Sequence, residues 1–198
     1  ELCYQVTGQV SFEACWPAAK ILWVREHEPE IFASIRHILL LEDYMLYLLT
    51  GRFVSECSLL SSTEYWDIRT KKYWPEMLEF LGVDEKWLPK IIEPGQLVGR
   101  ILPEMAEELG LSPDVKISSG CMDQVAAAVG VGNIYPGIFS ENIGASLAIC
   151  APTEHLTYDP KRQMPVHYFA MPNTYMMHTF TTGGMCFRWF RDNFCQNE

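Results

Sequence analysis

The sequence predicts an α/β fold, because twice along the chain an apolar segment typical of a strand is followed directly by a segment typical of a helix. Residues 36–41 are expected to form a buried strand, and residues 42–50 a helix that Gly51 ends. Residues 115–119 are likewise expected to form a strand, which Gly120 separates from an alanine-rich helix. Strands alternating with helices are the pattern of this fold class.

The composition indicates a globular domain and excludes several classes of function. Of the 198 residues, 48% are hydrophobic, including six Trp, nine Tyr and ten Phe, which is ample for a packed core. A net charge of −10 and the absence of a long basic cluster disfavour nucleic acid as a partner. The apolar runs 38–41 and 45–49 fall short of the ~20 residues that a membrane helix needs, and residues 1–5 do not resemble a signal peptide.

The cysteines give no sign of a disulfide or zinc scaffold. Their number is odd, they are scattered, and no C-x-x-C pair occurs. We therefore interpret them as reduced thiols, which predicts a cytoplasmic protein. The seven positions are Cys3, Cys15, Cys57, Cys121, Cys150, Cys186 and Cys195.

Proline in the first turn and glycine after the last turn delimit the other predicted helices of the first half. The elements expected there are, in chain order, a helix over 17–27, a polar connecting region over 55–72, a helix over 73–81, a loop over 87–95, a strand over 97–102 and a helix over 103–109.

The second half is expected to consist mainly of strands. Residues 137–143 and 146–151 predict a hairpin joined at Gly144, and residues 152–165, rich in proline and charge, suit a domain border. Strands are expected at 166–171 and 175–180, and Gly183-Gly184 is expected to open a final helix.

Asp123 is the leading candidate for chemistry. It follows the glycine turn after the strand 115–119, and open α/β sheets bind ligands at the carboxyl ends of their strands. Asp is also a favoured N-cap residue, so a role in capping the helix that follows is equally open from the residues alone.

Several short motifs in a specific order resemble those of the FGGY carbohydrate kinases, and they cover the whole chain. They are Ala19-Lys20-Ile21-Leu22-Trp23 with Pro29-Glu30, Asp43-Tyr44 with Leu48-Leu49-Thr50-Gly51, Leu88-Pro89-Lys90-Ile91 with Pro94-Gly95 and Val98-Gly99, and residues 120–132. The resemblance implies two actin-like domains, each with a ribonuclease H-like sheet, that bind sugar and ATP between them. It also implies an incomplete chain, with residues 1–151 the later part of the sugar-binding domain and 152–198 the beginning of the nucleotide-binding domain.

On this resemblance Asp123 is the catalytic base, which accepts the proton of the attacking hydroxyl. Gln124 matches a position that hydrogen-bonds substrate hydroxyls, with a solvated surface glutamine as the alternative. Cys15 or Trp16 falls where glycerol kinase has an aromatic substrate contact, although packing is the simpler interpretation of both.

The nucleotide-binding residues are implied in two places. Gly144, Ala145 and Ser146 match the second phosphate loop, in which Ala145 replaces the usual threonine and so removes a hydroxyl. Gly184 and Arg188 match a second nucleotide element, where a helix start offers free N–H groups to phosphate. An ordinary hairpin turn, a helix-start glycine and a solvent-facing arginine are the alternatives.

The resemblance implies an ATP-dependent kinase that transfers the γ-phosphoryl group to a hydroxyl of a ketose or polyol, with a ketopentose such as xylulose leading. Mg²⁺ is expected with the nucleotide, and no metal ligand is expected in the chain. The expected partners are the sugar or polyol and ATP, with no nucleic acid and no membrane, and a homodimer is left open. The alternatives are a non-catalytic sugar- or nucleotide-binding relative and an inactive fragment; we expect these 198 residues alone to be inactive.

Overall fold

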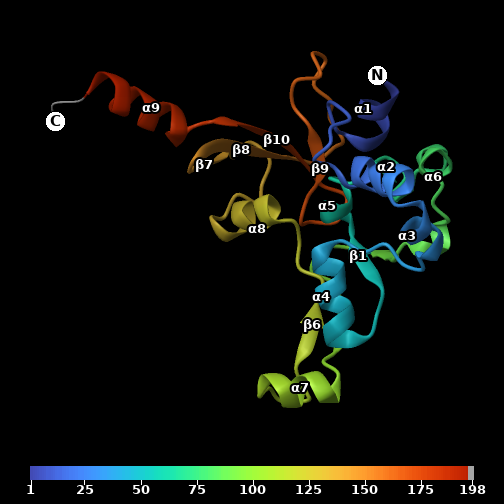
Figure 1. Cartoon of the computed structure of the whole chain (residues 1–198). Helices are drawn as coiled ribbons and strands as arrows, with labels where there is room; N and C mark the ends of the chain where they lie inside the picture. Colours follow the sequence, from blue (N-terminus) through green and yellow to red (C-terminus); the bar gives the residue numbers. More distant parts are fainter. Residues whose placement is uncertain (196–198) are drawn as a thin grey trace.

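The computed structural model describes residues 1–195 as a mixed α/β structure (Figure 1). The helices are α1 (Leu2–Thr7), α2 (Pro17–His27), α3 (Pro29–Ser34), α4 (Leu41–Thr50), α5 (Cys57–Leu60), α6 (Pro75–Leu81), the 3₁₀ helix η1 (Glu85–Trp87), α7 (Pro103–Leu109), α8 (Asp123–Gly130) and α9 (Gly184–Phe194). The strands are β1 (Val54–Glu56), β2 (Trp66–Asp67), β3 (Lys72–Tyr73), β4 (Lys90–Ile92), β5 (Leu97–Arg100), β6 (Lys116–Ser118), β7 (Ser140–Ile143), β8 (Ser146–Thr153), β9 (Val166–Tyr168) and β10 (Tyr175–Thr182).

The largest sheet belongs to the second half of the chain. Its four strands are antiparallel in the order β7-β8-β10-β9, and β8 pairs with β10 along its whole length. The first half contributes strand pairs only: β1 with β4 in parallel, and β2 with β3 and β5 with β6 in antiparallel orientation. In Figure 1, α8 lies beside the β7–β8 hairpin, while α9 extends from the end of β10 away from the body.

The main hydrophobic core joins the two halves. Trp66 and Ile68 from the first half are fully buried in the same cluster as Val166 and Tyr168 of β9. The rings of Trp66 and Tyr168 meet edge to face, with their centroids 6.2 Å apart. Strand β9 therefore belongs both to the four-stranded sheet and to the core of the first half.

The segment around α1 is attached to this core through β9. Gly8 follows α1 with a left-handed φ of +77°, and its carbonyl accepts the N–H of Val166 at 2.8 Å. The Tyr4 hydroxyl donates to the carbonyl of Met164 at 2.7 Å and accepts from the N–H of Asp159. A Cβ at Gly8 would lie 2.2 Å from the Val166 carbonyl oxygen, so only glycine fits this approach.

Most helices agree with the expectations from sequence. Helices α2, α6 and α7 each have proline in the first turn, and α4, α6 and α7 end at Gly51, Gly82 and Gly110 in the left-handed conformation. The hairpin over β7 and β8 and the strands β5, β6, β9 and β10 are also confirmed.

The expected strand over residues 36–41 is wrong. Residues 35–40 form a connector outside any strand, held by a hydrogen bond from Ile38 N–H to Trp87 O at 2.8 Å and by His37 stacked on Phe53. An apolar run alone does not supply a pairing partner. Strand β1 pairs instead with β4, in parallel orientation. Strand β4 lies within residues 87–95, which were expected to form a loop.

The expectation that residues 55–72 form only a connecting region is also wrong. It contains β1, α5 and β2, and it is among the most buried parts of the chain. Several of its buried polar side chains bond to the local backbone; Thr63, for example, donates to Leu60 O at 2.7 Å.

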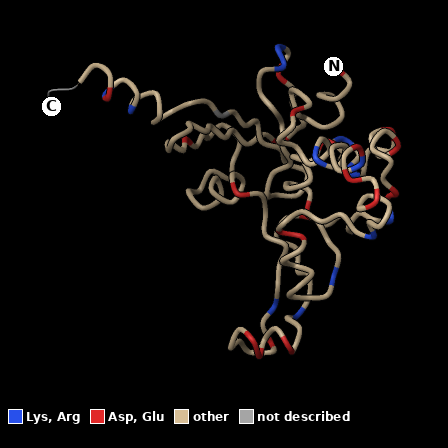
Figure 2. The backbone as a smooth tube through the Cα atoms, in the orientation of Figure 1, with Lys and Arg blue, Asp and Glu red and all other residues tan. Residues whose placement is uncertain are grey.

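Acidic and basic residues are distributed over many elements, as Figure 2 shows. Among residues 1–195, no helix is both long enough and apolar enough to cross a membrane.

Candidate active site

Asp123 is the first residue of α8, five positions beyond the end of β6. Its side chain is exposed, and Oδ1 accepts the N–H of Gln124 at 2.6 Å. The sequence of strand, glycine turn and helix is thus confirmed, with Gly120 in the left-handed region at φ +70°. The N-cap position itself belongs to Met122, so Asp123 stabilises the first turn without being the N-cap.

Asp123 was expected beside a ligand because it follows a strand of an open sheet, and this expectation about the sheet is wrong. Strand β6 pairs antiparallel with β5 in a two-stranded ribbon, and not within an open parallel sheet. The position of Asp123 therefore depends on the contacts of its own turn and helix.

The turn before Asp123 is held by the loop after β4. The carbonyl of Gly120 accepts Gly95 N–H at 2.8 Å, and Ser119 N–H donates to Gln96 O at 3.0 Å. The Ser119 hydroxyl donates to the carbonyl of Glu93 at 3.2 Å. These bonds fix residues 119–120 to the loop 93–96.

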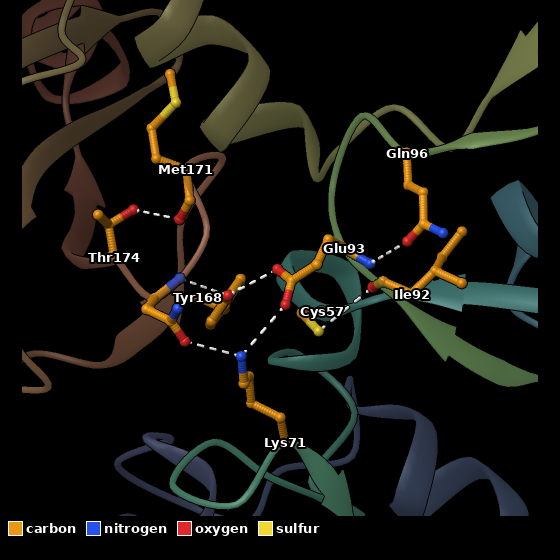
Figure 3. A network of polar contacts seen from close by, with 9 residues as sticks. Cys57, Lys71, Ile92, Glu93, Gln96, Tyr168, Met171 and Thr174 are labelled. Carbon is orange, nitrogen blue, oxygen red and sulfur yellow. Dashed lines mark hydrogen bonds and ion pairs between the residues drawn. The ribbon is translucent and has the colours of Figure 1, made fainter.

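That loop is attached in turn to the β9–β10 turn through the side chain of Glu93 (Figure 3). Tyr168 donates its hydroxyl to Glu93 Oε2 at 2.7 Å and accepts the N–H of Asn173 at 2.6 Å. Lys71 Nζ donates to Glu93 Oε1 at 3.2 Å and to Asn173 Oδ1 at 2.8 Å. One polar network therefore joins the residue 71 loop, the loop 93–96 and the four-stranded sheet.

Helix α8 packs on the sheet through an apolar face. Met122, Val125 and Ala128 share a buried cluster with Cys150 and Met176 of the sheet. A helix of small residues allows this close approach. The packing fixes the face of α8 that points toward β8 and β10.

The charge of Asp123 acts on two buried groups of that sheet, His178 of β10 and Cys150 of β8, which are register partners. Burial lowers the pKa of His178, and the nearby Asp123 carboxylate opposes that shift. Burial raises the pKa of the Cys150 thiol; a hydrogen bond with Ser140 opposes the shift, and the charge of Asp123 adds to it. The Asp123 carboxylate is thus close enough to the sheet to affect the pKa values of His178 and Cys150.

Gln124 lines a cavity of about 250 Å³ between α8 and the β7–β8 hairpin. Gln124 is half-buried. The other polar residues of the cavity wall are Ser140, Glu141 and Asn142. The arrangement provides hydroxyl, carboxylate and carboxamide groups around a space lined by Gln124, the residue after Asp123.

The two segments expected to bind nucleotide lie against each other. Gly184 N–H donates to Gly144 O at 2.9 Å, and the N–H groups of Gly183 and Met185 donate to Ala145 O at 3.1 and 3.2 Å. The hairpin turn and the start of α9 are therefore joined, as a common site requires. The amides of Gly184 and Met185 are engaged within the chain, so the expectation of free N–H groups there is wrong.

Two side chains near this junction keep chemistry that suits phosphate oxygens. Ser146 is exposed at the first position of β8, opposite Thr182. Arg188 lies on α9, and its side chain is 75% exposed with Asp192 at 3.9 Å. A hydroxyl donor and an accessible guanidinium fit a phosphate group.

Cys15 and Trp16 lie just before α2, the first exposed and the second half-buried. The Cys15 thiol donates to Glu13 Oε2 at 3.9 Å. Trp16 occupies the N-cap position of α2. Their surroundings give no further reason to place either in the site.

Sequence reasoning missed two buried acids. Glu56 is 2% exposed, and its carboxylate accepts Ser58 N–H at 2.7 Å and Leu59 N–H at 2.6 Å. Burial raises its pKa to about 7, against the lowering effect of these hydrogen bonds. The available signal was local, because an acid directly before a short helical turn is typical of an N-cap.

Glu64 is a second buried acid that was missed. It has a left-handed φ of +66°, and neither carboxylate oxygen has a hydrogen-bond partner among the described residues. Burial raises the pKa of Glu64 to about 8, and the charge of Glu13 adds to the shift. Within residues 1–195, no group of three or more His, Cys, Asp or Glu side chains is arranged to hold a metal ion.

Comparison with known proteins places this geometry in context. A family model described as the FGGY family of carbohydrate kinases, N-terminal domain, matches residues 1–130. The chain is 30% identical over 196 residues to the xylulose kinase of Lactococcus lactis subsp. lactis (strain IL1403), which covers 96% of this chain and 38% of that protein. It is 34% identical over 142 residues to the xylulose kinase of Haemophilus influenzae, covering 70% of this chain and 29% of that protein.

A solved structure gives the same result for the fold. The crystal structure of ligand-bound xylulose kinase from Lactobacillus acidophilus matches with a TM-score of 0.90 and 26% identity, covering 97% of this chain and 39% of that one. The chain thus spans between 29% and 39% of the length of these three proteins.

Proposed function

This chain belongs to the FGGY family of carbohydrate kinases, and we propose that the whole protein transfers the γ-phosphoryl group of ATP to a hydroxyl of a ketose or polyol. The chain has the corresponding part of the ribonuclease H-like, actin-like ATPase fold. A ketopentose such as xylulose is the leading acceptor, because the two relatives from Lactococcus lactis and Haemophilus influenzae described above are named xylulose kinases.

The observation that carries the proposal is the position of Asp123. An exposed carboxylate begins α8, the next residue, Gln124, lines a cavity with polar and apolar walls, and the turn before Asp123 is fixed by several hydrogen bonds. Phosphoryl transfer needs a group that orients the attacking hydroxyl and accepts its proton. We assign that role to Asp123; a positioned base is worth roughly 10² to 10⁴ in rate.

Gln124 is proposed to bind the sugar. Its carboxamide both donates and accepts hydrogen bonds, which suits adjacent hydroxyl groups of a ketose or polyol. Its half-buried position at the cavity supports this role. The bound sugar would then present one hydroxyl to Asp123.

The nucleotide is proposed to bind at the junction of Gly144, Ala145 and Ser146 with Gly184 and Arg188. Ser146 and Arg188 would hold phosphate oxygens, and the paired glycines allow the two backbone segments to approach closely. ATP with its Mg²⁺ supplies the phosphoryl group that is transferred. Because Ala145 lacks a hydroxyl, we expect Ser146 to carry the hydroxyl contact.

The domain division and cellular setting are proposals of the same kind. We propose that residues 1–151 belong to the sugar-binding domain and residues 152–198 to the start of the nucleotide-binding domain, although β8 continues to Thr153. The seven free cysteines support a reducing cytoplasm. A homodimer is compatible with this setting.

The test is ADP release by the full-length parent protein with Mg-ATP and a panel of ketopentoses, ketohexoses and polyols. We expect one acceptor to raise ADP release far above background, and Asp123→Asn to reduce kcat by at least 10²-fold. Asp114→Asn, which changes an exposed aspartate paired with Arg100, is the matched control and should retain activity. No response to any acceptor would overturn the proposal in favour of a non-catalytic binding protein.

A further inference from the structure

A buried hydrogen bond joins α5 directly to the residue before Asp123. The N–H of Met122 donates to Oγ of Ser58 at 2.9 Å, across 64 positions of sequence. Ser58 is 0% exposed and Met122 is 9% exposed. A bond so well shielded from water has a defined geometry, because leaving either group without a partner there is costly.

Met122 occupies a position that decides where α8 begins. It is the N-cap residue of α8, and no side chain of its own caps the helix. Its carbonyl accepts Ala126 N–H at 2.8 Å, which is the first hydrogen bond of the helix. Met122 therefore joins α5 through its N–H and α8 through its carbonyl, with Asp123 as the next residue.

Ser58 is itself fixed by Glu56. The Ser58 hydroxyl donates to Glu56 Oε1 at 2.8 Å, so that its oxygen is turned to accept from Met122. The same Glu56 carboxylate caps α5 by accepting two backbone N–H groups. The three residues form a directed chain of hydrogen bonds from amide to hydroxyl to carboxylate, in which each bond strengthens the next.

A second contact holds the side chain of the same residue. The Ser62 hydroxyl lies 3.3 Å from Sδ of Met122 and donates to it. The backbone and the side chain of Met122 are thus both held by the segment 58–62. Asp123 itself is exposed, so its carboxylate depends on this support for its place.

We propose that Ser58, backed by Glu56, is a positioning residue that sets the place of the Asp123 carboxylate relative to the acceptor hydroxyl. This inference rests on the proposed role of Asp123 as the base. Ser58 touches neither substrate, and it acts through the backbone of Met122. A displacement of about 1 Å at a reacting group can cost on the order of 10² in rate.

The test compares Ser58→Ala with a matched serine in the full-length protein. Ser61 lies at the end of the same helix and is also buried, but it donates to Cys57 O and accepts from Tyr168 N–H, toward the sheet. We expect Ser58→Ala to lower kcat roughly 10- to 100-fold with the sugar KM changed less than about threefold. Ser61→Ala should lose comparable thermal stability and keep kcat within about threefold.

Two further variants separate positioning from general damage. Ser58→Thr keeps the hydroxyl and should restore most of the kcat that Ser58→Ala loses. In the Asp123→Asn background, Ser58→Ala should have little further effect on kcat, because the group that it positions has lost its function.

The outcomes are distinct for the two proposals. If Asp123→Asn leaves kcat unchanged, the proposed function of Asp123 fails. If Asp123→Asn abolishes turnover while Ser58→Ala keeps kcat within twofold, the positioning role fails alone. Equal losses of kcat in Ser58→Ala and Ser61→Ala, or full additivity of Ser58→Ala with Asp123→Asn, would also overturn it.

Discussion

The carbonyl oxygen of Gly144 lies so close to Gly184 that a Cβ built on Gly184 would be only 2.4 Å from it. The two residues are also joined by the hydrogen bond from Gly184 N–H to that oxygen. Since real Cβ atoms do not approach a carbonyl oxygen this closely, any side chain at position 184 must separate the hairpin from α9. Position 184 therefore requires glycine because there is no room for a side chain, and not because its φ is left-handed.

Gly184→Ala is therefore expected to destabilise the protein by roughly 1–3 kcal/mol, because backbone must move to admit the methyl group. It should also raise the KM for ATP in the full-length kinase, since both segments belong to the proposed nucleotide site. The midpoint of denaturant unfolding and ATP-dependent kinetics measure the two effects.

Gly130→Ala is the control for that substitution. Gly130 ends α8, and a Cβ there meets no atom within 4 Å. Alanine in a helix is favoured over glycine by about 0.5–1 kcal/mol, so this variant should be neutral or more stable. Equal destabilisation by both substitutions would contradict the proposed crowding at Gly184.

Gly8→Ala is expected to detach the segment around α1 from β9. The added Cβ would lie 2.2 Å from the Val166 carbonyl oxygen, in addition to the strain of φ +77°. The expected cost is above about 3 kcal/mol, combining left-handed strain with overpacking. Loss of amide protection at Val166, whose N–H donates to Gly8 O, would report the detachment in hydrogen exchange.

Gly110→Ala separates the strain of left-handed φ from the steric overlap of the added Cβ with its surroundings. Gly110 also has positive φ, at +66°, but it has open space where the Cβ would lie. Only the strain of roughly 1–2 kcal/mol is then expected. A Gly8→Ala variant no less stable than Gly110→Ala would show that the contact with Val166 is dispensable.

Glu64→Gln is expected to stabilise the protein increasingly as the pH rises. The pKa of Glu64 is about 8 in the folded protein against an ordinary value of 4.5, so the folded state binds its proton more tightly. Wild-type stability must then fall between pH 4.5 and pH 8 and level off above, by roughly 5 kcal/mol. Glutamine does not titrate, so the stability difference should grow across the same window.

Thermal unfolding at a series of pH values measures this difference. Glu104→Gln, at an exposed position in the first turn of α7, controls for the general loss of one negative charge. A Glu64→Gln effect that is the same at pH 5 and pH 9 would show that the buried carboxylate does not titrate in this range.

Tyr168→Phe is expected to cost roughly 1–3 kcal/mol, because it leaves Glu93 and the N–H of Asn173 without their shared hydroxyl partner. Together with Glu93→Gln it forms a double-mutant cycle. Side chains that touch in this way should show a coupling energy of about 0.5–3 kcal/mol.

Denaturant unfolding of the four proteins of the cycle measures that coupling. Tyr158→Phe serves as the comparison, since the Tyr158 hydroxyl bonds to Gln5 O and not to the network of Glu93. Additive effects of Tyr168→Phe and Glu93→Gln would mean that the network does not join the loop 93–96 to the sheet.

The sequence was sufficient for several features that depend on neighbouring residues, among them the ends of three helices. Gly51, Gly82 and Gly110 end helices because each takes up left-handed φ, and this requirement can be recognised from the residues around them. The glycine turn before Asp123 was recognised for the same reason. The left-handed conformation costs glycine little, whatever lies elsewhere in the chain.

Pairing between distant segments could not be predicted in the same way. Residues 38–41 are as apolar as a buried strand, yet β4 and not this segment lies beside β1. Glu56 and Ser58 were missed because burial of polar groups depends on partners that the hydrophobic pattern does not reveal. Likewise, both segments of the proposed nucleotide site were recognised, but their mutual hydrogen bonds, which occupy the amides of Gly184 and Met185, were not.

The attachment of Tyr4 to Met164 has a consequence for synthesis of the protein. The two residues are separated by 160 positions, so the hydroxyl of Tyr4 cannot make both of its hydrogen bonds, with Asp159 N–H and Met164 O, until the ribosome has added Met164. At about 5–20 residues per second, that delay is roughly 8–30 s. During this time the side chains of Tyr4 and Val6, both buried in the folded protein, are exposed to solvent or bound by a chaperone.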